Sequence, residues 1–116
     1  MPTQNQCQLV LCTCPDEGSA QTIAEQLVDQ NLAACVNILP GIASIYHWQG
    51  KRESAHEQLL VIKTTKSVYD ELEKTIIGLH PYELPEIIAI NIEAGNEGYL
   101  NWIRDSISKN AAKNLN

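Results

Sequence analysis

The chain has 116 residues, of which 44% are hydrophobic, so residues 1–116 can form one domain with a buried core. Its net charge of −6 leaves no basic patch able to neutralise several phosphates, which argues against nucleic acid as a partner. Because the sequence has neither a signal-peptide pattern nor an apolar run of membrane-spanning length, we expect a cytoplasmic protein with no membrane partner and with reduced cysteines.

The first predicted unit is a strand followed by a helix. Residues 7–14, CQLVLCTC, form a short apolar run typical of a strand buried on both faces, and Pro15 ends it. Asp16 is expected to cap the helix that follows. The inward face of that helix recurs at helical spacing and comprises Ala20, Ile23, Ala24, Leu27 and Val28.

A long β-hairpin is predicted for residues 35–64, with its turn at residues 49–51. Each arm of roughly 14 residues would extend ~45 Å, whereas a compact domain of this length has a radius of gyration of only ~13 Å. The hairpin must therefore bend sharply or project from its domain. Pro40 and Gly41 mark the expected bend, because proline removes a ladder donor and glycine tolerates a bulge.

The second half of the chain predicts a helix, a strand and a further helix. Thr65 is expected to cap the first of these helices, and the prolines in residues 80–86, HPYELPE, force a loop after it. Residues 86–92, EIIAINI, form the most hydrophobic predicted strand and are expected at the centre of the sheet. The last helix is expected over about residues 97–109, followed by a loose polar tail from Asn110. The predicted inward faces are Val68, Leu72, Ile76 and Leu79 in the earlier helix and Tyr99, Leu100, Ile103 and Ile107 in the later one.

This order of elements predicts an α+β fold, a ferredoxin-like βαββαβ sandwich with a long hairpin between its second and third strands and an extra C-terminal helix. In such a sandwich the helices cover one face of the sheet and leave the other bare. Tyr46 and Trp48 share one face of the hairpin, which a two-stranded arm cannot cover. Both features predict association with other subunits.

Cysteine and histidine residues supply the candidate metal ligands. Cys12 and Cys14 form a C-x-C pattern on one strand, so both sulfurs point to the same face, and paired thiolates are the soft ligands that Cu(I) prefers. Buried cysteines can equally act as small hydrophobic residues, which is our interpretation of Cys7 and Cys35. His80 is expected to be exposed at a helix end, where its ring can bind a metal or cap the helix carbonyls.

Other polar and aromatic residues lie on elements expected to meet between subunits. If Lys63 is buried there, it needs a carboxylate partner such as Glu57 or Glu86. Such a group can be an ion-pair network that holds an oligomer, or a pocket for a small ligand or metal at an interface cleft. The predicted cleft residues are Trp48, Glu57, Lys63, Tyr82, Glu83 and Glu86. No catalytic triad order, phosphate-binding glycine loop or zinc-protease pattern occurs, so an enzyme is not expected.

Several stretches together resemble the CutA family, which is named for divalent cation tolerance. They are LVLCTCPDE at 9–17, LAACVNILPGIASIYHWQGK at 32–51, LLVIKT at 59–64, HPYELPEIIA at 80–89 and YLNWI at 99–103. The resemblance covers nearly the whole length and implies a homotrimer of ferredoxin-like protomers. Their sheets are expected to face inward and their hairpins to wrap neighbours, as in the P-II signal-transduction proteins. It implies no catalytic activity.

The resemblance also implies a metal site. Family members are linked to tolerance of copper and other divalent metals and, in animals, to anchoring of a membrane enzyme. The family's copper site uses a cysteine at the position of Cys12 and histidines directly before a Pro-Tyr pair, where this chain has Leu79 and His80. One imidazole is therefore missing, and Glu86 is a possible replacement ligand, although carboxylate suits Cu(I) poorly. The expected ligands are Cys12, His80 and Glu86, for copper or another divalent metal.

Two functions are predicted. The first is a cytoplasmic homotrimer of the divalent-cation-tolerance type, which binds copper or other divalent metal ions and takes part in the response to metal ions. The alternative is a P-II-like trimeric signalling or scaffold protein that binds a small ligand or a protein at its subunit clefts. Near the expected cleft only Lys63 offers a cationic phosphate contact, which disfavours a nucleotide ligand.

Overall fold

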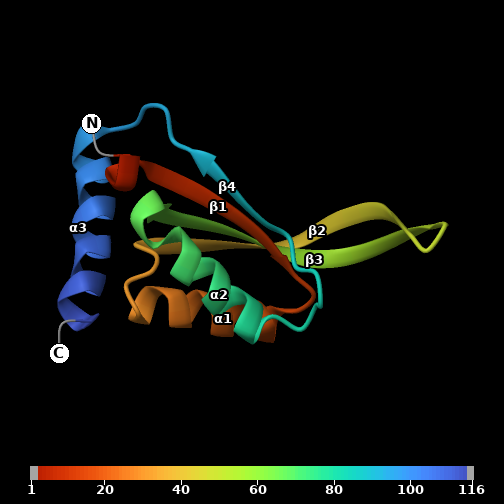
Figure 1. The fold of residues 1–116 in the computed structure, drawn as a ribbon. Helices are drawn as coiled ribbons and strands as arrows, with labels where there is room; N and C mark the ends of the chain where they lie inside the picture. Colours follow the sequence, from red (N-terminus) through yellow and green to blue (C-terminus); the bar gives the residue numbers. More distant parts are fainter. Residues whose placement is uncertain (1–2, 115–116) are drawn as a thin grey trace.

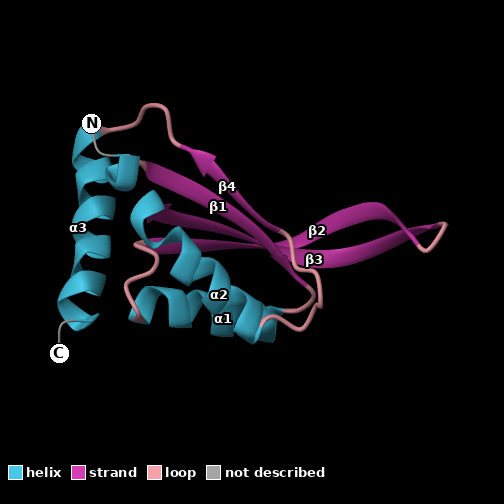
Figure 2. Cartoon of the chain, in the orientation of Figure 1, coloured by secondary structure: helices cyan, strands magenta, loops and turns pink. Residues whose placement is uncertain are grey.

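An antiparallel sheet with strand order β2-β3-β1-β4 organises the computed structural model, which describes residues 3–114 (Figure 1). Its strands are β1 (Cys7–Cys14), β2 (Cys35–Trp48), β3 (Lys51–Thr65) and β4 (Ile87–Asn91). The α-helices are α1 (Glu17–Asp29), α2 (Tyr69–Leu79) and α3 (Glu97–Asn114), with 3-10 turns at Thr3–Asn5 and Lys66–Val68. Helices α1 and α2 lie against one face of the sheet, and α3 lies across its end (Figure 2). The predicted α+β, ferredoxin-like arrangement is confirmed.

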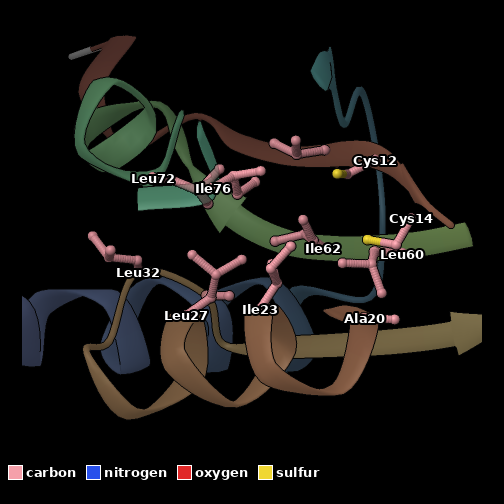
Figure 3. Packing of buried hydrophobic residues seen from close by; sticks show 12 residues of the cluster. Cys12, Cys14, Ala20, Ile23, Leu27, Leu32, Leu60, Ile62, Leu72 and Ile76 are labelled. Carbon is pink, nitrogen blue, oxygen red and sulfur yellow. The ribbon is translucent and has the colours of Figure 1, made fainter. Parts of the chain in front are cut away.

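The main core lies between the sheet and helices α1 and α2. Successive side chains of a strand point to opposite faces, so Val10 of β1 is fully buried against the helices while Leu9 and Leu11 on the other face are only half-buried. Figure 3 shows Ile23 and Leu27 of α1 pointing into this core toward the strands. The structure therefore leaves one face of the sheet without the cover that the helices give to the other.

The β2–β3 hairpin bends and projects as its length predicts. Gln49 and Gly50 form its turn with positive φ angles of 51° and 81°. The pairing register shifts between Leu39 and Ile42, where Gly41 has a φ of 71°, so the expected bulge lies at the expected place. Beyond it the arm extends past the helices (Figure 1). The radius of gyration is accordingly 15.0 Å, above the ~13 Å of a compact domain of this size.

The predicted central position of the fourth strand is wrong, because β4 pairs with β1 only and forms an edge of the sheet. Ile88 and Ile90 lie opposite Leu11 and Leu9, on the face that α1 and α2 do not cover, and remain 50% and 46% exposed. The hydrophobicity of this strand therefore does not reflect burial within the protomer. A strand can be apolar because it is buried within its own protomer or because another surface covers it. Both cases give the same hydrophobic sequence pattern, so the sequence does not distinguish them.

The helix predictions hold at the centre of each apolar stripe and fail at its margin. Asp16 caps α1, since its Oδ1 accepts a hydrogen bond from the Ser19 N–H at 2.7 Å. The Thr65 hydroxyl instead shares a 2.7 Å hydrogen bond with the Ser67 hydroxyl and does not cap a helix. The confirmed inward residues include Ala20, Ile23, Ala24, Leu27, Leu72, Ile76, Ile103 and Ile107. The wrong ones are Val28, Leu79 and Tyr99, which are 39%, 40% and 43% exposed.

The predicted loose tail is also wrong at its start, because α3 continues to Asn114. The buried Asn110 donates a hydrogen bond from Nδ2 to the Gln30 carbonyl at 2.9 Å, which ties α3 to the end of α1. No helix among the described residues is long and apolar enough to cross a membrane.

Candidate functional site

Cys12, Cys14 and His80 form a buried cluster whose potential ligand atoms all lie within 4.8 Å of one another. The cysteines are two positions apart on β1, so both point to the face that the helices cover (Figure 3). His80 follows the last residue of α2 and is only 8% exposed, so the prediction of an exposed ring is wrong. The ring turns inward because hydrogen bonds hold it at the end of β1.

Both nitrogens of the His80 ring have partners. Nδ1 accepts a hydrogen bond from the Tyr82 backbone N–H at 3.1 Å, so Nδ1 is unprotonated and the proton lies on Nε2. Nε2 donates it to the Thr13 carbonyl at 2.7 Å. The ring therefore joins β1 to the loop after α2 and does not cap helix carbonyls; the backbone N–H of His80 donates to the Ile76 carbonyl at 2.8 Å. A metal bound by this ring must displace one of these partners.

The two thiols of the cluster are electrostatically coupled. A hydrogen bond with Cys14 and then burial raise the pKa of the Cys12 thiol, and the charges of Glu86 and Glu57 raise it further. The same hydrogen bond lowers the pKa of Cys14. The two thiols therefore lose their protons as one interacting pair.

The structure places the other predicted metal ligand and the remaining cysteines outside this cluster. Glu86 is exposed and is not among the residues whose ligand atoms lie within 4.8 Å of one another. Cys7 is buried against Ile103 of α3, and Cys35 is half-buried with its sulfur 3.8 Å from the Lys63 Nζ. Sequence spacing thus points to Cys12 and Cys14, while the meeting of both with His80 depends on the fold.

A pocket of about 530 Å³ lies beside the thiol–imidazole cluster, between the hairpin arm and the loop after α2. The buried Glu57 accepts a hydrogen bond from the Tyr82 hydroxyl at 2.9 Å, and burial followed by this bond raises the pKa of Tyr82 to about 12. The Tyr82 and His80 ring centroids are 4.9 Å apart, so the pocket wall contacts the cluster. The predicted cleft residues that line this pocket are Trp48, Glu57, Tyr82, Glu83 and Glu86.

Lys63 is the predicted cleft residue that the structure does not bring to this pocket. It lies six positions beyond Glu57 on β3, about 20 Å away along the strand. Its Nζ donates to the Asn37 Oδ1 and approaches Cys35, so within one protomer it does not pair with Glu57 or Glu86. Tyr46 does line the pocket, although the sequence indicated it only as a residue covered on assembly. Tyr46 lies two residues before Trp48 on the same strand, and this spacing could have indicated that both side chains lie on the pocket face.

Comparisons with known proteins agree on one family. Residues 8–106 match the family described as CutA1 divalent ion tolerance protein. The divalent-cation tolerance protein CutA of Thermus thermophilus is 48% identical over 99 residues, which cover 85% of this chain and 96% of that protein. The chloroplastic protein CutA of Arabidopsis thaliana is 42% identical over 98 residues, but the match spans only 54% of it and 84% of this chain.

Solved structures show the same relationship. The crystal structure of CutA from Xylella fastidiosa has a TM-score of 0.86 and 44% identity, with 88% of this chain and 98% of that chain covered. The CutA1 crystal structure from Oryza sativa has a TM-score of 0.86 and 40% identity, with 90% and 95% covered. Since sequence and fold agree over most of its length, the chain belongs to the CutA1 family of divalent ion tolerance proteins.

Proposed function

We propose that this protein binds a soft metal ion, with copper as the first candidate, and takes part in the response to metal ions. The observation that carries the proposal is the convergence of Cys12, Cys14 and His80 within 4.8 Å. Thiolate and imidazole are ligands for Cu(I) and zinc, whereas calcium and magnesium require clustered oxygens. The family description as divalent ion tolerance proteins supports the same reading.

The donor set fits a metal of low coordination number. In the proposed site Cys12 and His80 keep their predicted roles, and Cys14 takes the place expected for Glu86. Binding by the imidazole costs the ring one of its two hydrogen bonds, to Tyr82 or to Thr13. Each such bond contributes about 1 kcal/mol, so we expect a modest affinity and at most one ion per chain.

A Cu(I) titration under reducing conditions tests this proposal, with competition against a coloured Cu(I) chelator as the readout. Cys12→Ser, Cys14→Ser and His80→Ala should each weaken binding by tenfold or more. Cys7→Ser is the matched control, because Cys7 is equally buried but belongs to another part of the core. If the parent binds neither copper nor zinc, or if all cluster variants bind like the parent, the site has been assigned incorrectly.

We also propose a cytoplasmic homotrimer without catalytic activity. Large apolar side chains support the assembly: Ile45 and Trp48 on the hairpin arm are 72% and 58% exposed, and Ile88 and Ile90 lie on the face that α1 and α2 leave uncovered. The cytoplasmic location rests on the sequence, and the Arabidopsis relative is named chloroplastic. Cell fractionation tests it, since recovery of the protein in another compartment would contradict it.

A second candidate function is P-II-like, in which a trimeric signalling or scaffold protein binds a small ligand or a protein at its clefts. The pocket of about 530 Å³ favours this role, because its volume falls within the range of small-molecule sites. It also lies at the base of the projecting arm, where subunits are expected to meet. The two roles are compatible, since the pocket and the thiol–imidazole cluster use different side chains.

A further inference from the structure

The pocket beside the hairpin arm has a strongly acidic lining. Within one protomer Glu57, Glu83 and Glu86 line it, and no lysine, arginine or histidine of the described residues does so. Glu57 is only 7% exposed, and the hydrogen bond it accepts comes from the neutral Tyr82 phenol. A buried carboxylate is strongly stabilised by a nearby positive charge. The lining therefore favours a cationic occupant.

Aromatic rings form the rest of the pocket's distinctive surface. Tyr46 and Trp48 are two apart on β2 and so lie on one face of the arm, with 46% and 58% of their surface exposed within one protomer. Tyr82 faces the pocket from the opposite loop, held by Glu57 and packed on the His80 ring. The face of an aromatic ring carries negative charge density and attracts cations, with tryptophan the strongest.

The carboxylates are not arranged around a metal ion. Among the described residues, the only group of three or more histidine, cysteine or acidic side chains that could converge on one ion is Cys12, Cys14 and His80. The pocket carboxylates are therefore spread around a space of about 530 Å³. A space of this size, with both aromatic and acidic walls, suits a cation with an apolar body.

We propose that this pocket binds a small organic cation, an ammonium or guanidinium compound whose apolar part lies against Tyr46 and Trp48. Glu57 and Glu86 supply the opposing charge, and Tyr82 supplies a further ring face. The inference rests on the second proposed role and names its ligand class. The pocket is distinct from the proposed metal site, because neither Cys12 nor Cys14 lines it.

Tryptophan fluorescence tests the proposal on the full chain. The sequence has two tryptophans, so Trp102→Tyr leaves Trp48 as the sole indole reporter. The probes are choline and its uncharged carbon analogue, 3,3-dimethylbutan-1-ol, which has nearly the same shape. Choline should give a saturable change in the Trp48 signal, and the uncharged analogue should bind at least tenfold more weakly. Glu57→Gln, which keeps a hydrogen-bond acceptor for Tyr82, should weaken choline binding at least tenfold.

Controls separate charge in the pocket from folding and from general acidity. Glu86 also lines the pocket but is exposed, so Glu86→Gln is not expected to affect folding. It should reduce choline affinity several-fold, which keeps the proposal testable even if Glu57→Gln fails to fold. Glu93→Gln removes an exposed carboxylate outside the pocket and should change nothing. Cys12→Ser should weaken copper binding at least tenfold and leave choline binding intact. The guanidinium class is tested with n-butylguanidinium as a second probe. The proposal would be overturned if choline and its neutral analogue bound equally well, or if neither choline nor n-butylguanidinium bound.

Discussion

Replacing Ile88 and Ile90 with threonine should dissociate the proposed trimer without unfolding the protomer. Both side chains lie on the sheet face that α1 and α2 do not cover, where they are 50% and 46% exposed. Complete burial of an isoleucine contributes about 1.5–3 kcal/mol, so covering the exposed half of each contributes about 1 kcal/mol. Threonine keeps the β-branch that suits a strand but loses most of this contribution.

The double variant should therefore lose about 2 kcal/mol per protomer, or about 6 kcal/mol per trimer, which is roughly a 10⁴-fold change in the association constant. Size-exclusion chromatography with light scattering at micromolar concentration measures it. The parent should run at three times the 12.9 kDa protomer mass, and the variant should shift toward the protomer.

Ile77→Thr is the matched control, since Ile77 is 54% exposed on α2 and is not expected in the interface. It should leave the mass unchanged. Far-ultraviolet circular dichroism should show a folded protomer in each case, because the helix-facing side of the sheet is untouched. A parent that runs at 12.9 kDa, or a double variant that remains fully trimeric, would refute the reasoning.

Three further predictions concern stability and titration. Gly50→Ala should lower the free energy of unfolding by about 1 kcal/mol because Gly50 has a φ of +81°, whereas Gly78→Ala, in a helix with open space around it, should raise it by about 0.5–1 kcal/mol; thermal melts compare the two. Ile62→Ala, at a fully buried position, should cost about 2–5 kcal/mol in urea unfolding, and a smaller loss would mean that the core collapses around the gap. Burial and the hydrogen bond to Glu57 raise the pKa of Tyr82 to about 12, so its contribution to stability is complete below pH ~10 and is lost as the pH rises toward 12. Burial and the hydrogen bond to Glu73 also raise the pKa of Tyr69 to about 12, so ultraviolet titration of the parent should show a late phenol step that Tyr82→Phe reduces without abolishing it. Identical curves for parent and variant would contradict the assigned environment.

Local sequence patterns predicted the helices, strands and turns well where the pattern has a single physical explanation. Asp16 caps α1 because a carboxylate directly before a helix meets unpaired N–H groups, whatever lies elsewhere in the fold. Gly50 marks the hairpin turn because few residues other than glycine adopt its backbone conformation at low cost. The spacing of Cys12 and Cys14 likewise placed both sulfurs on one face.

The candidate site was only partly predictable for the same kind of reason. Most of the predicted cleft residues line one pocket, because the hairpin and the Pro-rich loop could be placed from their own sequences. Lys63 does not reach this pocket within one protomer, because the strand register places it opposite Cys35 and its Nζ donates to Asn37. Its predicted pairing with a carboxylate of another subunit stays a prediction. His80 was expected outward because a helix end is normally solvated, yet Thr13 and Tyr82 offer its ring hydrogen bonds inside.

By itself, the sequence determined the order of strands and helices, the bend and turn of the hairpin, and the pair of thiols on one face of β1. These features depend on neighbours within a few residues, and the chain carries that information directly. Only the tertiary structure decided that β4 is an edge strand, that the His80 ring completes the thiol cluster, and that Glu57 is buried against Tyr82. Each of these features depends on contacts between residues far apart in the chain. An apolar sequence pattern indicates that a side chain is buried, but it does not identify the surface that buries it.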